Sequence, residues 1–230
     1  MEKQRKITIA IDGPAASGKS TTARIVAREL GYLHIDTGAM YRAVTLWVLQ
    51  HGIPVEDESR IDGILEMIKI HLEPRSEGNR VFLNEIEVTD AIRTLDVTSN
   101  VSAVSSYSRV REVMVLEQRR IAANGGVVLD GRDIGTIVLP KADLKIFMIA
   151  NVVERAHRRM IELEGSGIHI DQNKLEVDLI ERDRKDSTRV VSPLKKAGDA
   201  IELDTTNLSI TEQVGFVLLK ARELIEGKGI

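Results

Sequence analysis

Between an aliphatic run and an amphipathic stretch, the sequence reads Gly13-Pro14-Ala15-Ala16-Ser17-Gly18-Lys19-Ser20. This segment fits the pattern G-x-x-x-x-G-K-[ST] in full, in the strand–loop–helix context that a phosphate-binding loop needs. The backbone N–H groups of such a loop converge on phosphate oxygens, and the N-terminus of the following helix adds partial positive charge. We expect Lys19 to neutralise the β- and γ-phosphates of a nucleoside triphosphate and the Ser20 hydroxyl to bind Mg²⁺.

Aliphatic runs of strand length alternate with helical patterns along the chain. Three of the runs are almost continuously apolar, which is typical of strands covered on both faces. Apolar spacing predicts one helix over residues 23–30, with Gly31 as its C-cap, and another over residues 109–123. The alternation predicts an α/β fold with a parallel sheet in a three-layer core. The predicted strands are residues 6–12, 32–36, 127–130, 144–149 and 199–203.

Residues 62–100 interrupt this alternation. Two short strand-like runs between His71 and Asp90 flank Ser76-Glu77-Gly78-Asn79, which has the composition of a hairpin turn. We interpret residues 62–100 as an inserted subdomain. A second interruption, Glu164-Gly165-Ser166-Gly167, follows an arginine-rich stretch and is predicted to form the tip of a mobile lid.

The composition excludes several classes of protein. The 230 residues include 32 Lys and Arg against 35 Asp and Glu, a formal net charge of −3, whereas a protein that coats nucleic acid has a strongly basic surplus. Three Phe, three Tyr and one Trp are too few for stacking along a single strand. The absence of cysteine excludes disulfides and thiolate metal sites, and no apolar run is long enough to span a membrane. We therefore expect an intracellular globular protein, with room for a local basic pocket.

A second phosphate-sized site is predicted after the second strand, where residues 36–42 read DTGAMYR. Thr37 is a suitable N-cap for a helix beginning near Ala39, and Arg42 lies about one turn into that helix. The group Asp130-Gly131-Arg132-Asp133 comes at the carboxyl end of the third strand, the edge at which open α/β sheets bind ligands. Three charges there are costly unless they are solvated or paired with a ligand. An ordinary cap and a structural ion pair are the alternatives for these two segments.

Two further groups of charged residues fall on helix faces. They are Arg182, Asp186 and Arg189 before Pro193, and Arg155, Arg158 and Arg159. Such faces are usually solvated or bound to nucleic acid, but the acidic total and the phosphate loop favour clamps on transferring phosphates. Taken with the two anion sites, these groups favour phosphoryl transfer.

The motifs, in this order, resemble those of the bacterial cytidylate kinase family, the (d)CMP kinases among the P-loop nucleoside monophosphate kinases. The resemblance runs nearly from end to end of the chain. The first motif is shared with many kinases, whereas the second and third in this order are specific. The residues that carry the resemblance are 11–21 (IDGPAASGKST), 36–43 (DTGAMYRA), 130–136 (DGRDIGT), 154–159 (ERAHRR) and 181–183 (ERD).

The resemblance implies an Mg²⁺-dependent reaction, ATP + (d)CMP → ADP + (d)CDP, in the cytoplasm. It also implies a three-layer P-loop kinase core with a five-stranded parallel sheet, formed by residues 1–61, 101–153 and 171–230. Residues 62–100 would be the insertion that binds the nucleoside monophosphate, and residues 154–170 a short lid. The implied partners are the small nucleotides ATP and CMP or dCMP, with no nucleic acid and no membrane, and we expect a monomer.

The resemblance also implies a role for each motif residue. The catalytic cations would be Lys19, Arg132 and Arg158, with Ser20 on the metal. The ATP-binding residues would be Gly13, Pro14, Ala15, Ala16, Ser17, Gly18, Lys19, Ser20, Thr21, Arg155, Arg158 and Arg159. The implied CMP-binding residues are Arg42, Arg132 and Arg189 on the phosphate, Ser102, Arg111 and Asp133 on cytosine, and Arg182 and Asp186 on the ribose, together with Thr37, Tyr41 and Asp130.

Phosphoryl transfer to a phosphate fits the lack of an evident catalytic dyad. A phosphate acceptor is mostly dianionic at neutral pH and needs no general base, so none of the five histidines requires a chemical role. Three alternatives remain open: a kinase for UMP, AMP or shikimate, a non-catalytic nucleotide switch or RNA-associated module, and a structural domain that retains the loop. The last would need Arg42, Arg132 and Arg182 to lie apart in space.

Overall fold

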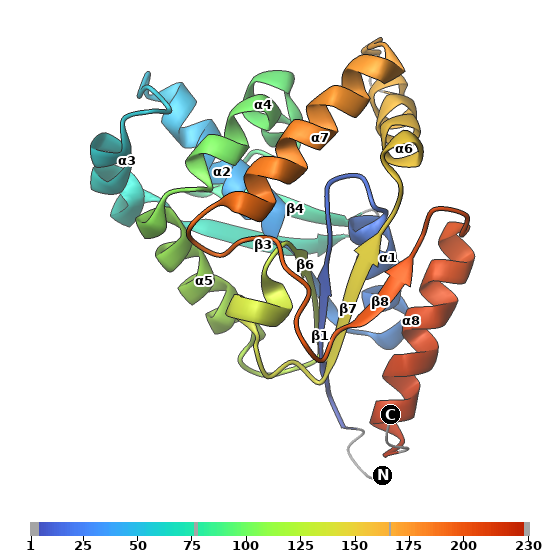
Figure 1. Ribbon diagram of the computed structural model, residues 1–230. Coiled ribbons are helices and arrows are strands. Elements are labelled where there is room, and N and C mark those ends of the chain that lie inside the picture. The colour runs from blue at the N-terminus through green and yellow to red at the C-terminus, as the bar shows by residue number, and fades with distance from the viewer. Residues whose placement is uncertain (1–4, 76–77, 166, 228–230) are drawn as a thin grey trace.

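A parallel sheet in the order β2-β6-β1-β7-β8 runs through the middle of the molecule (Figure 1). The computed structural model describes residues 5–75, 78–165 and 167–227. The strands are β1 (Thr8–Asp12), β2 (Leu33–Asp36), β6 (Val127–Gly131), β7 (Leu144–Ile149) and β8 (Ile201–Asp204). Each lies within two residues of a predicted run, and every neighbouring pair is parallel. The predicted α/β fold with its five-stranded parallel sheet is therefore confirmed.

Helices cover both faces of this sheet, which gives the molecule three layers (Figure 1). Successive side chains of a strand point to opposite faces. Accordingly Ile9 and Ile11 pack with α1 and α8, whereas Ala10 packs with the helices on the other side. The helices are α1 (Lys19–Leu30) and α8 (Ile210–Ile225) on one face, and α2 (Thr37–Gln50), α4 (Leu95–Val104) and α5 (Ser108–Ala122) on the other. The helices predicted over residues 23–30 and 109–123 correspond to α1 and α5, and Gly31 is the C-cap of α1.

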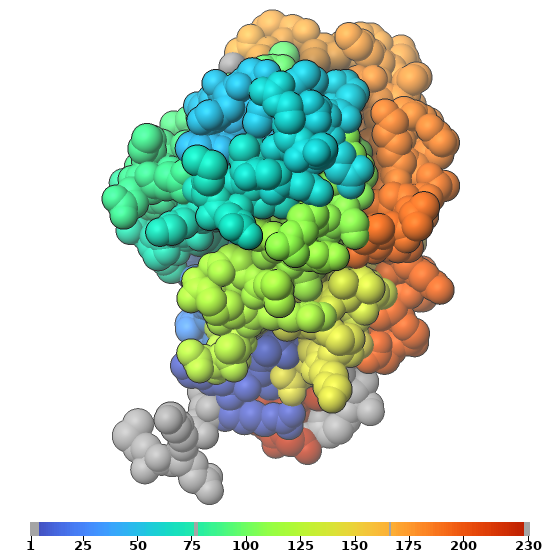
Figure 2. Space-filling view, turned by 90° about the vertical axis from the view of Figure 1, so that its left-hand side faces the viewer, coloured from blue at the N-terminus to red at the C-terminus, as the bar shows by residue number. Residues whose placement is uncertain are grey.

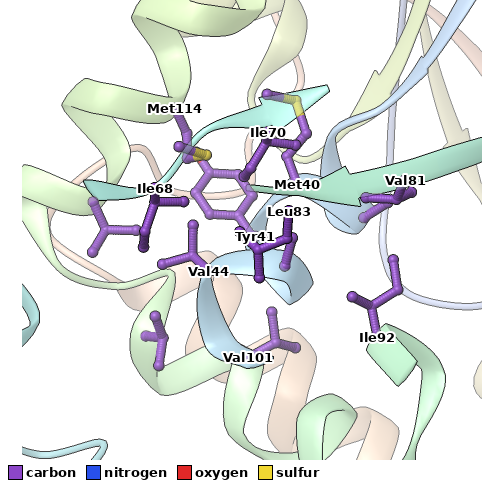
Figure 3. Close-up of a cluster of buried hydrophobic side chains, with 14 of the residues drawn as sticks. Met40, Tyr41, Val44, Ile68, Ile70, Val81, Leu83, Ile92, Val101 and Met114 are labelled. Carbon is purple, nitrogen blue, oxygen red and sulfur yellow. The ribbon is translucent and has the colours of Figure 1, made fainter. Parts of the chain in front are cut away.

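A small antiparallel sheet, β3-β4-β5, is inserted between α2 and α4. β3 and β4 pair with Leu72 opposite Val81, which confirms the predicted hairpin, although Ser76 and Glu77 at its turn lie outside the described residues. Figure 3 shows the inner side of this sheet gathered with apolar side chains of α2, α4 and α5 around Tyr41. The inserted elements are α3 (Glu58–Ile64), η1 (Leu65–Met67), β3 (Ile70–Arg75), β4 (Gly78–Leu83), β5 (Ile86–Glu87) and η2 (Ala91–Arg93).

Two long helices, α6 (Val152–Glu164) and α7 (Gln172–Thr188), stand above the carboxyl ends of the strands (Figure 1). They pack against each other through the apolar side chains of Ala156, Leu163 and Leu175. In the turned view of Figure 2, α7 in orange lies beside the cyan insertion and the green helices, and α4 contacts α7. The two helices and the insertion thus flank the same end of the parallel sheet.

The boundaries of the predicted subdomains stay predictions. The predicted insertion, residues 62–100, contains the antiparallel sheet, and the predicted lid, residues 154–170, contains most of α6. Ser166, at the predicted lid tip, lies outside the described residues. Among the residues that are described, no helix is both long and apolar enough to cross a membrane.

The predicted cap of α2 is wrong by one residue. α2 begins at Thr37, and its N-cap is Asp36, whose Oδ1 accepts a hydrogen bond from the Ala39 N–H at 2.9 Å. The Thr37 hydroxyl instead donates to the Asp130 carbonyl oxygen at 2.7 Å. A carboxylate at the N-cap accepts from the same backbone position that a threonine would, so the local sequence allowed either residue.

Candidate active site

The phosphate loop follows β1 and leads into α1, whose first residue is Lys19. Gly13 has φ +153°, and a Cβ there would stand 2.1 Å from the Met148 carbonyl oxygen of β7, so only glycine fits this close approach. The Lys19 ammonium, buried at the start of α1, donates to the Pro14 carbonyl oxygen at 2.8 Å. The Ser17 hydroxyl is buried in the loop with no hydrogen-bond partner among the described residues. Such an orphaned hydroxyl fits a loop shaped for an anion.

Asp130, at the end of β6, lies next to the phosphate loop. Its Oδ2 accepts from the Ser20 hydroxyl at 2.5 Å, and its Oδ1 is 2.8 Å from Nε2 of His34 in β2. Sequence reasoning assigned Asp130 to the CMP side, and the structure places its carboxylate against the residue expected to bind the metal. His34 was not singled out from the sequence, because its contact depends on strand order.

Asp12 joins the loop to the segment that carries Arg132 and Asp133. Its two carboxylate oxygens accept from the backbone N–H groups of Ile134 and Gly135, both at 2.7 Å. Burial raises the pKa of Asp12 to about 6, although these two hydrogen bonds oppose the rise. The sequence did carry a signal for Asp12, a charged residue ending a buried strand.

Cations from separate elements gather above this edge of the sheet. Burial, and next the Arg132 guanidinium, lower the pKa of Lys19 to about 7. Burial, and next Arg132, also lower the pKa of Arg182 to about 10, with a further contribution from Arg42. The Arg182 Nε is buried without a hydrogen-bond partner among the described residues. Such mutual repulsion is relieved by a bound polyanion.

The cations from α2, from the segment after β6 and from α7 are therefore close together, as the phosphoryl-transfer hypothesis requires. Arg42 pairs with Asp36 at 3.0 Å, and Arg132 pairs with Asp186 at 2.8 Å. The alternative that needed Arg42, Arg132 and Arg182 scattered in space is thereby excluded.

A second buried group lies between α2, α5 and β6. Arg111 and Asp133 form an ion pair with a 2.5 Å Nη2–Oδ2 distance, and their side chains are only 3% and 4% exposed. The Arg111 guanidinium also lies 5.1 Å from the centroid of the Tyr41 ring. Burial and the nearby Arg111 lower the pKa of Arg189, which follows α7. Four residues assigned to CMP from the sequence thus lie together.

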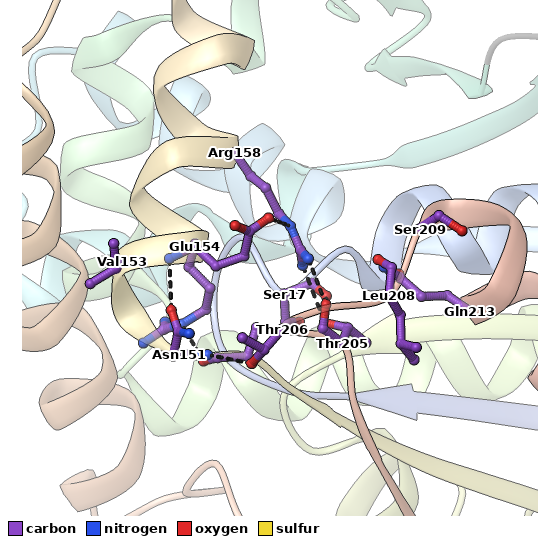
Figure 4. Close-up of polar contacts among 12 residues, drawn as sticks. Ser17, Asn151, Val153, Glu154, Arg158, Thr205, Thr206, Leu208, Ser209 and Gln213 are labelled. Carbon is purple, nitrogen blue, oxygen red and sulfur yellow. Dashed lines mark hydrogen bonds and ion pairs between the residues drawn. The ribbon is translucent and has the colours of Figure 1, made fainter.

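The arginines of α6 contact the phosphate loop and the loop after β8. Arg155 donates to the Ala15 carbonyl oxygen at 3.3 Å and pairs with Asp183 at 2.7 Å. Arg158 donates to the Thr205 carbonyl oxygen at 2.6 Å and to its hydroxyl at 3.1 Å (Figure 4). Arg159 pairs with Glu162 at 2.7 Å on the helix itself.

Two residues from the C-terminal part of the chain, Thr205 and Gln213, form hydrogen bonds with the phosphate loop and the first turn of α1. The Thr205 hydroxyl donates to the Ser17 carbonyl oxygen at 2.9 Å. Gln213 accepts from the Thr22 hydroxyl at 3.0 Å, and a Cβ on Gly18 would stand 2.8 Å from its Oε1. Neither Thr205 nor Gln213 belongs to a recognisable motif, so sequence reasoning missed both.

Two of the residues predicted for the site, Ser102 and Thr21, form no side-chain hydrogen bond with the other predicted site residues among those that the structure describes. In the described part of the chain, the Ser102 side chain makes no hydrogen bond to another predicted residue, and only its carbonyl oxygen accepts from the Ser105 hydroxyl at 3.3 Å. Thr21 is exposed on α1. The described residues also contain no group of three or more His, Cys, Asp or Glu side chains that could hold a metal ion by themselves.

A sequence model of the family described as cytidylate kinase matches residues 9–223. This chain belongs to the cytidylate kinase family. A cytidylate kinase of Bacillus pumilus is 52% identical over 215 residues, which cover 94% of this chain and 96% of that protein. A cytidylate kinase of Anoxybacillus flavithermus is 52% identical over 224 residues, 97% of this chain and 100% of that protein.

Among solved structures, a gluconokinase aligns with this member of the cytidylate kinase family. The gluconokinase from Sinorhizobium meliloti aligns over 98% of this chain and 97% of its own, with a TM-score of 0.49 and 15% sequence identity.

Proposed function

We propose that the protein transfers the γ-phosphate of ATP to CMP or dCMP, giving ADP and CDP or dCDP. The observation that carries the proposal is the group of cations at the sheet edge, the buried Lys19 with the half-buried Arg132 and Arg182, in which burial and Arg132 lower the pKa of both Lys19 and Arg182. Two nucleotides that meet through their phosphates are the ligands that such a group stabilises. Membership of the cytidylate kinase family supports the choice of acceptor.

The donor side of the site is formed by the phosphate loop, residues 13–21, and by the arginines of α6. Lys19 would exchange its contact with the Pro14 carbonyl oxygen for the β- and γ-phosphates. Arg155 and Arg158 already reach across to the loop and to Thr205, so α6 is positioned to cover ATP. Arg159 would close on the triphosphate from the same helix. A covered site excludes water, which would otherwise hydrolyse ATP.

The residues beside Lys19 fit a Mg²⁺ ion bound together with ATP. The Ser20 hydroxyl and the Asp130 carboxylate are adjacent hard oxygen donors, and Mg²⁺ is typically held by one or two carboxylates together with substrate phosphates. Ser20 would bind the ion, with Asp130 beside it. When bound, the ion neutralises phosphate charge as the phosphoryl group is transferred.

The acceptor side combines a buried base-reading pair with arginines for the phosphate. Asp133 would accept from the N4 amino group of cytosine, and Arg111 would donate to N3 and O2. Ser102, which the resemblance assigns to cytosine, lies on α4, and the Ser105 carbonyl oxygen at the end of the same helix accepts from Arg111 at 2.9 Å. Arg42, Arg132 and Arg189 would hold the CMP phosphate, and the Tyr41 ring supports the Arg111 guanidinium.

The ribose would be held by Asp186, which lies beside Arg132 and Arg189. Arg182 was assigned to the ribose as well, and its proximity to Lys19 and Arg132 also suits it to the phosphates. Thr37 contributes by fixing the backbone at Asp130.

The chain supplies positioning and charge rather than a general base. The acceptor phosphate is itself a nucleophile at neutral pH. Lys19, Arg132 and Arg158 would offset the repulsion between the two polyanions and hold the reacting atoms in line. Nothing in the reaction then requires a proton to be removed by a side chain.

The test is the release of ADP from ATP with CMP, dCMP, UMP or AMP as the acceptor, using Lys19→Met as the control for contaminating activity. We expect CMP and dCMP to stimulate ADP release strongly, and UMP and AMP to do so far less. ADP release that no acceptor stimulates would overturn the proposal in favour of a nucleotide switch. Stimulation by another acceptor and not by CMP would identify a different small-molecule kinase.

A further inference from the structure

His34 connects the inserted hairpin with the residues beside the phosphate loop. It lies in β2, is only 8% exposed, and its Nε2 stands 2.8 Å from Asp130 Oδ1. The other oxygen of Asp130 accepts from the Ser20 hydroxyl at 2.5 Å. On its far side, the His34 carbonyl oxygen accepts from the Asn79 amide of β4 at 2.7 Å. Hydrogen bonds to the backbone of His34 and from its side chain thus connect β4 with Asp130 and the start of α1.

The strand register explains why His34 reaches Asp130. In the parallel pair β2–β6, Asp36 lies opposite Asp130 and His34 lies opposite Val128. His34 and Asp36 are two residues apart, so their side chains point to the same face. The Asp36 carboxylate pairs with Arg42 and accepts from the Ala39 N–H, and as an acceptor it cannot bond a second carboxylate, whereas the His34 ring can donate to Asp130.

Asp130 is held at both of its carboxylate oxygens. His34 Nε2 lies 2.8 Å from Oδ1, and Oδ2 accepts from the Ser20 hydroxyl. A carboxylate held at one oxygen alone would be free to rotate about its Cβ–Cγ bond, and Oδ2 would then leave the Ser20 hydroxyl.

We propose that His34 is a positioning residue that holds the Asp130 carboxylate against Ser20. This inference rests on the proposed function, because it concerns the binding of Mg²⁺ together with a nucleotide. His34 touches neither substrate nor metal in this arrangement and acts through Asp130. Groups that orient a metal-binding carboxylate commonly contribute about 10-fold or more to metal affinity or activity.

The direct test is calorimetric binding of ADP with and without Mg²⁺ to the wild type, His34→Phe, His34→Gln and Tyr32→Phe. His34→Phe keeps a planar ring of similar size and loses the N–H donor, whereas the amide of His34→Gln retains a donor. Tyr32→Phe is the matched control, because Tyr32 directly precedes β2 and its hydroxyl accepts from the Ile7 N–H at 3.1 Å, away from Asp130. His34→Met replaces His34→Phe in the comparison if the ring variant does not fold.

Mg²⁺ should increase the affinity for ADP, and we expect this increase to be about 10-fold smaller in His34→Phe than in the wild type. In His34→Gln and in Tyr32→Phe the increase should equal that of the wild type. ADP affinity without Mg²⁺ should change much less. In steady-state assays, the Mg²⁺ concentration for half-maximal rate should rise while KM for CMP stays within about twofold, the pattern of a specific loss at one ligand.

Two outcomes would overturn the inference. One is a Mg²⁺-dependent gain in His34→Phe equal to that of Tyr32→Phe. The other is an equal loss of ADP affinity with and without Mg²⁺, which would mean that His34 only supports the fold. Failure of the proposed function is separate, since it would appear as a wild-type protein that binds Mg²⁺ and ADP but does not use CMP.

Discussion

Arg132 donates through Nε to the Oδ2 of Asp186 at 2.8 Å, joining the end of β6 to α7 across 54 residues of sequence. Asp186 is shared, because the Arg189 guanidinium lies 3.8 Å from its other oxygen. Although burial opposes the shift, Arg132 and Arg182 hold the pKa of Asp186 below its usual range, so the carboxylate stays charged. The acidic residue is the internal counter-charge for arginines that a substrate phosphate would also neutralise.

Asp186→Asn should therefore destabilise the ligand-free protein by about 2–3 kcal/mol, the scale of a lost hydrogen bond to a charged group. The loss should shrink in saturating inorganic phosphate, which supplies negative charge and lacks the ribose that Asp186 is proposed to hold. Urea unfolding with and without saturating phosphate measures both effects. Glu181→Gln, which breaks an exposed pair with Arg184 on the same helix, should change the free energy of unfolding far less than Asp186→Asn does, because water screens an exposed ion pair. An equal loss in both conditions would show that Asp186 does not balance phosphate-binding charge.

Asp133→Asn should narrow the preference for CMP over UMP. The carboxylate accepts from the N4 amino group and repels the O4 of uracil, whereas an amide can donate to O4. We expect the ratio of kcat/KM for the two acceptors to fall by at least about 10-fold. The ratio is measured on one preparation, so it is independent of any loss of folded protein.

The same variant leaves the buried Arg111 guanidinium without its charge partner, and unfolding measurements should show a loss of about 3 kcal/mol. Glu112→Gln is the control, because Glu112 forms an exposed pair with Arg109 on the same helix. It should leave both the acceptor ratio and the stability nearly unchanged. If Asp133→Asn keeps the wild-type ratio, the base is read elsewhere.

Gly13→Ala tests the close packing of the phosphate loop. The added methyl would stand 2.1 Å from the Met148 carbonyl oxygen, and neither backbone segment can move without disturbing the β1–β7 pairing. We expect a lower thermal midpoint together with a loss of ADP affinity. Gly215→Ala is the opposite case, because a Cβ at this position in α8 meets nothing within 4 Å. It should stabilise the protein by about 0.5–1 kcal/mol, and an equal response of the two variants would refute the packing argument.

The strands were predictable because a parallel strand covered on both faces has an almost unbroken apolar sequence. Their ends were less so, as Asp199 illustrates. It was predicted to begin the last strand, yet β8 begins at Ile201, and Asp199 instead accepts from the Lys145 ammonium at 2.8 and 2.9 Å. An ion pair between residues 54 positions apart leaves no trace in local periodicity.

The candidate site also contains residues that could be predicted from the sequence and residues that could not. The phosphate loop is a continuous motif, so its residues could be identified from the sequence alone. Contacts such as His34 to Asp130 and Thr205 to Ser17 depend on strand order and on which loops meet at the sheet edge. Strand position placed Asp130 at the correct edge, but only the packing of α1 against β6 determines that it faces Ser20.

Lys19 should make the stability of the ligand-free protein rise with pH above neutrality. Burial and Arg132 lower its pKa from an ordinary 10.5 to about 7 in the folded protein. Above pH 7 the folded protein has released a proton that the unfolded chain still holds. The unfolded state then binds more protons, and the free energy of unfolding increases with pH. Below pH 7 both states are protonated, and the contribution from Lys19 is constant.

The measurement is the urea unfolding free energy of the wild type and of Lys19→Met at pH 7 and pH 9. This range avoids Asp12, whose pKa is about 6, and Tyr41, whose pKa burial raises to about 12. The wild type should gain stability relative to Lys19→Met between the two pH values. ADP should reduce that gain, because its phosphates favour the charged ammonium. If the stability difference between the two proteins is flat or falls with pH, the buried, cation-rich surroundings of Lys19 do not lower its pKa. The argument that this cluster of cations binds a phosphate ligand would then fail as well.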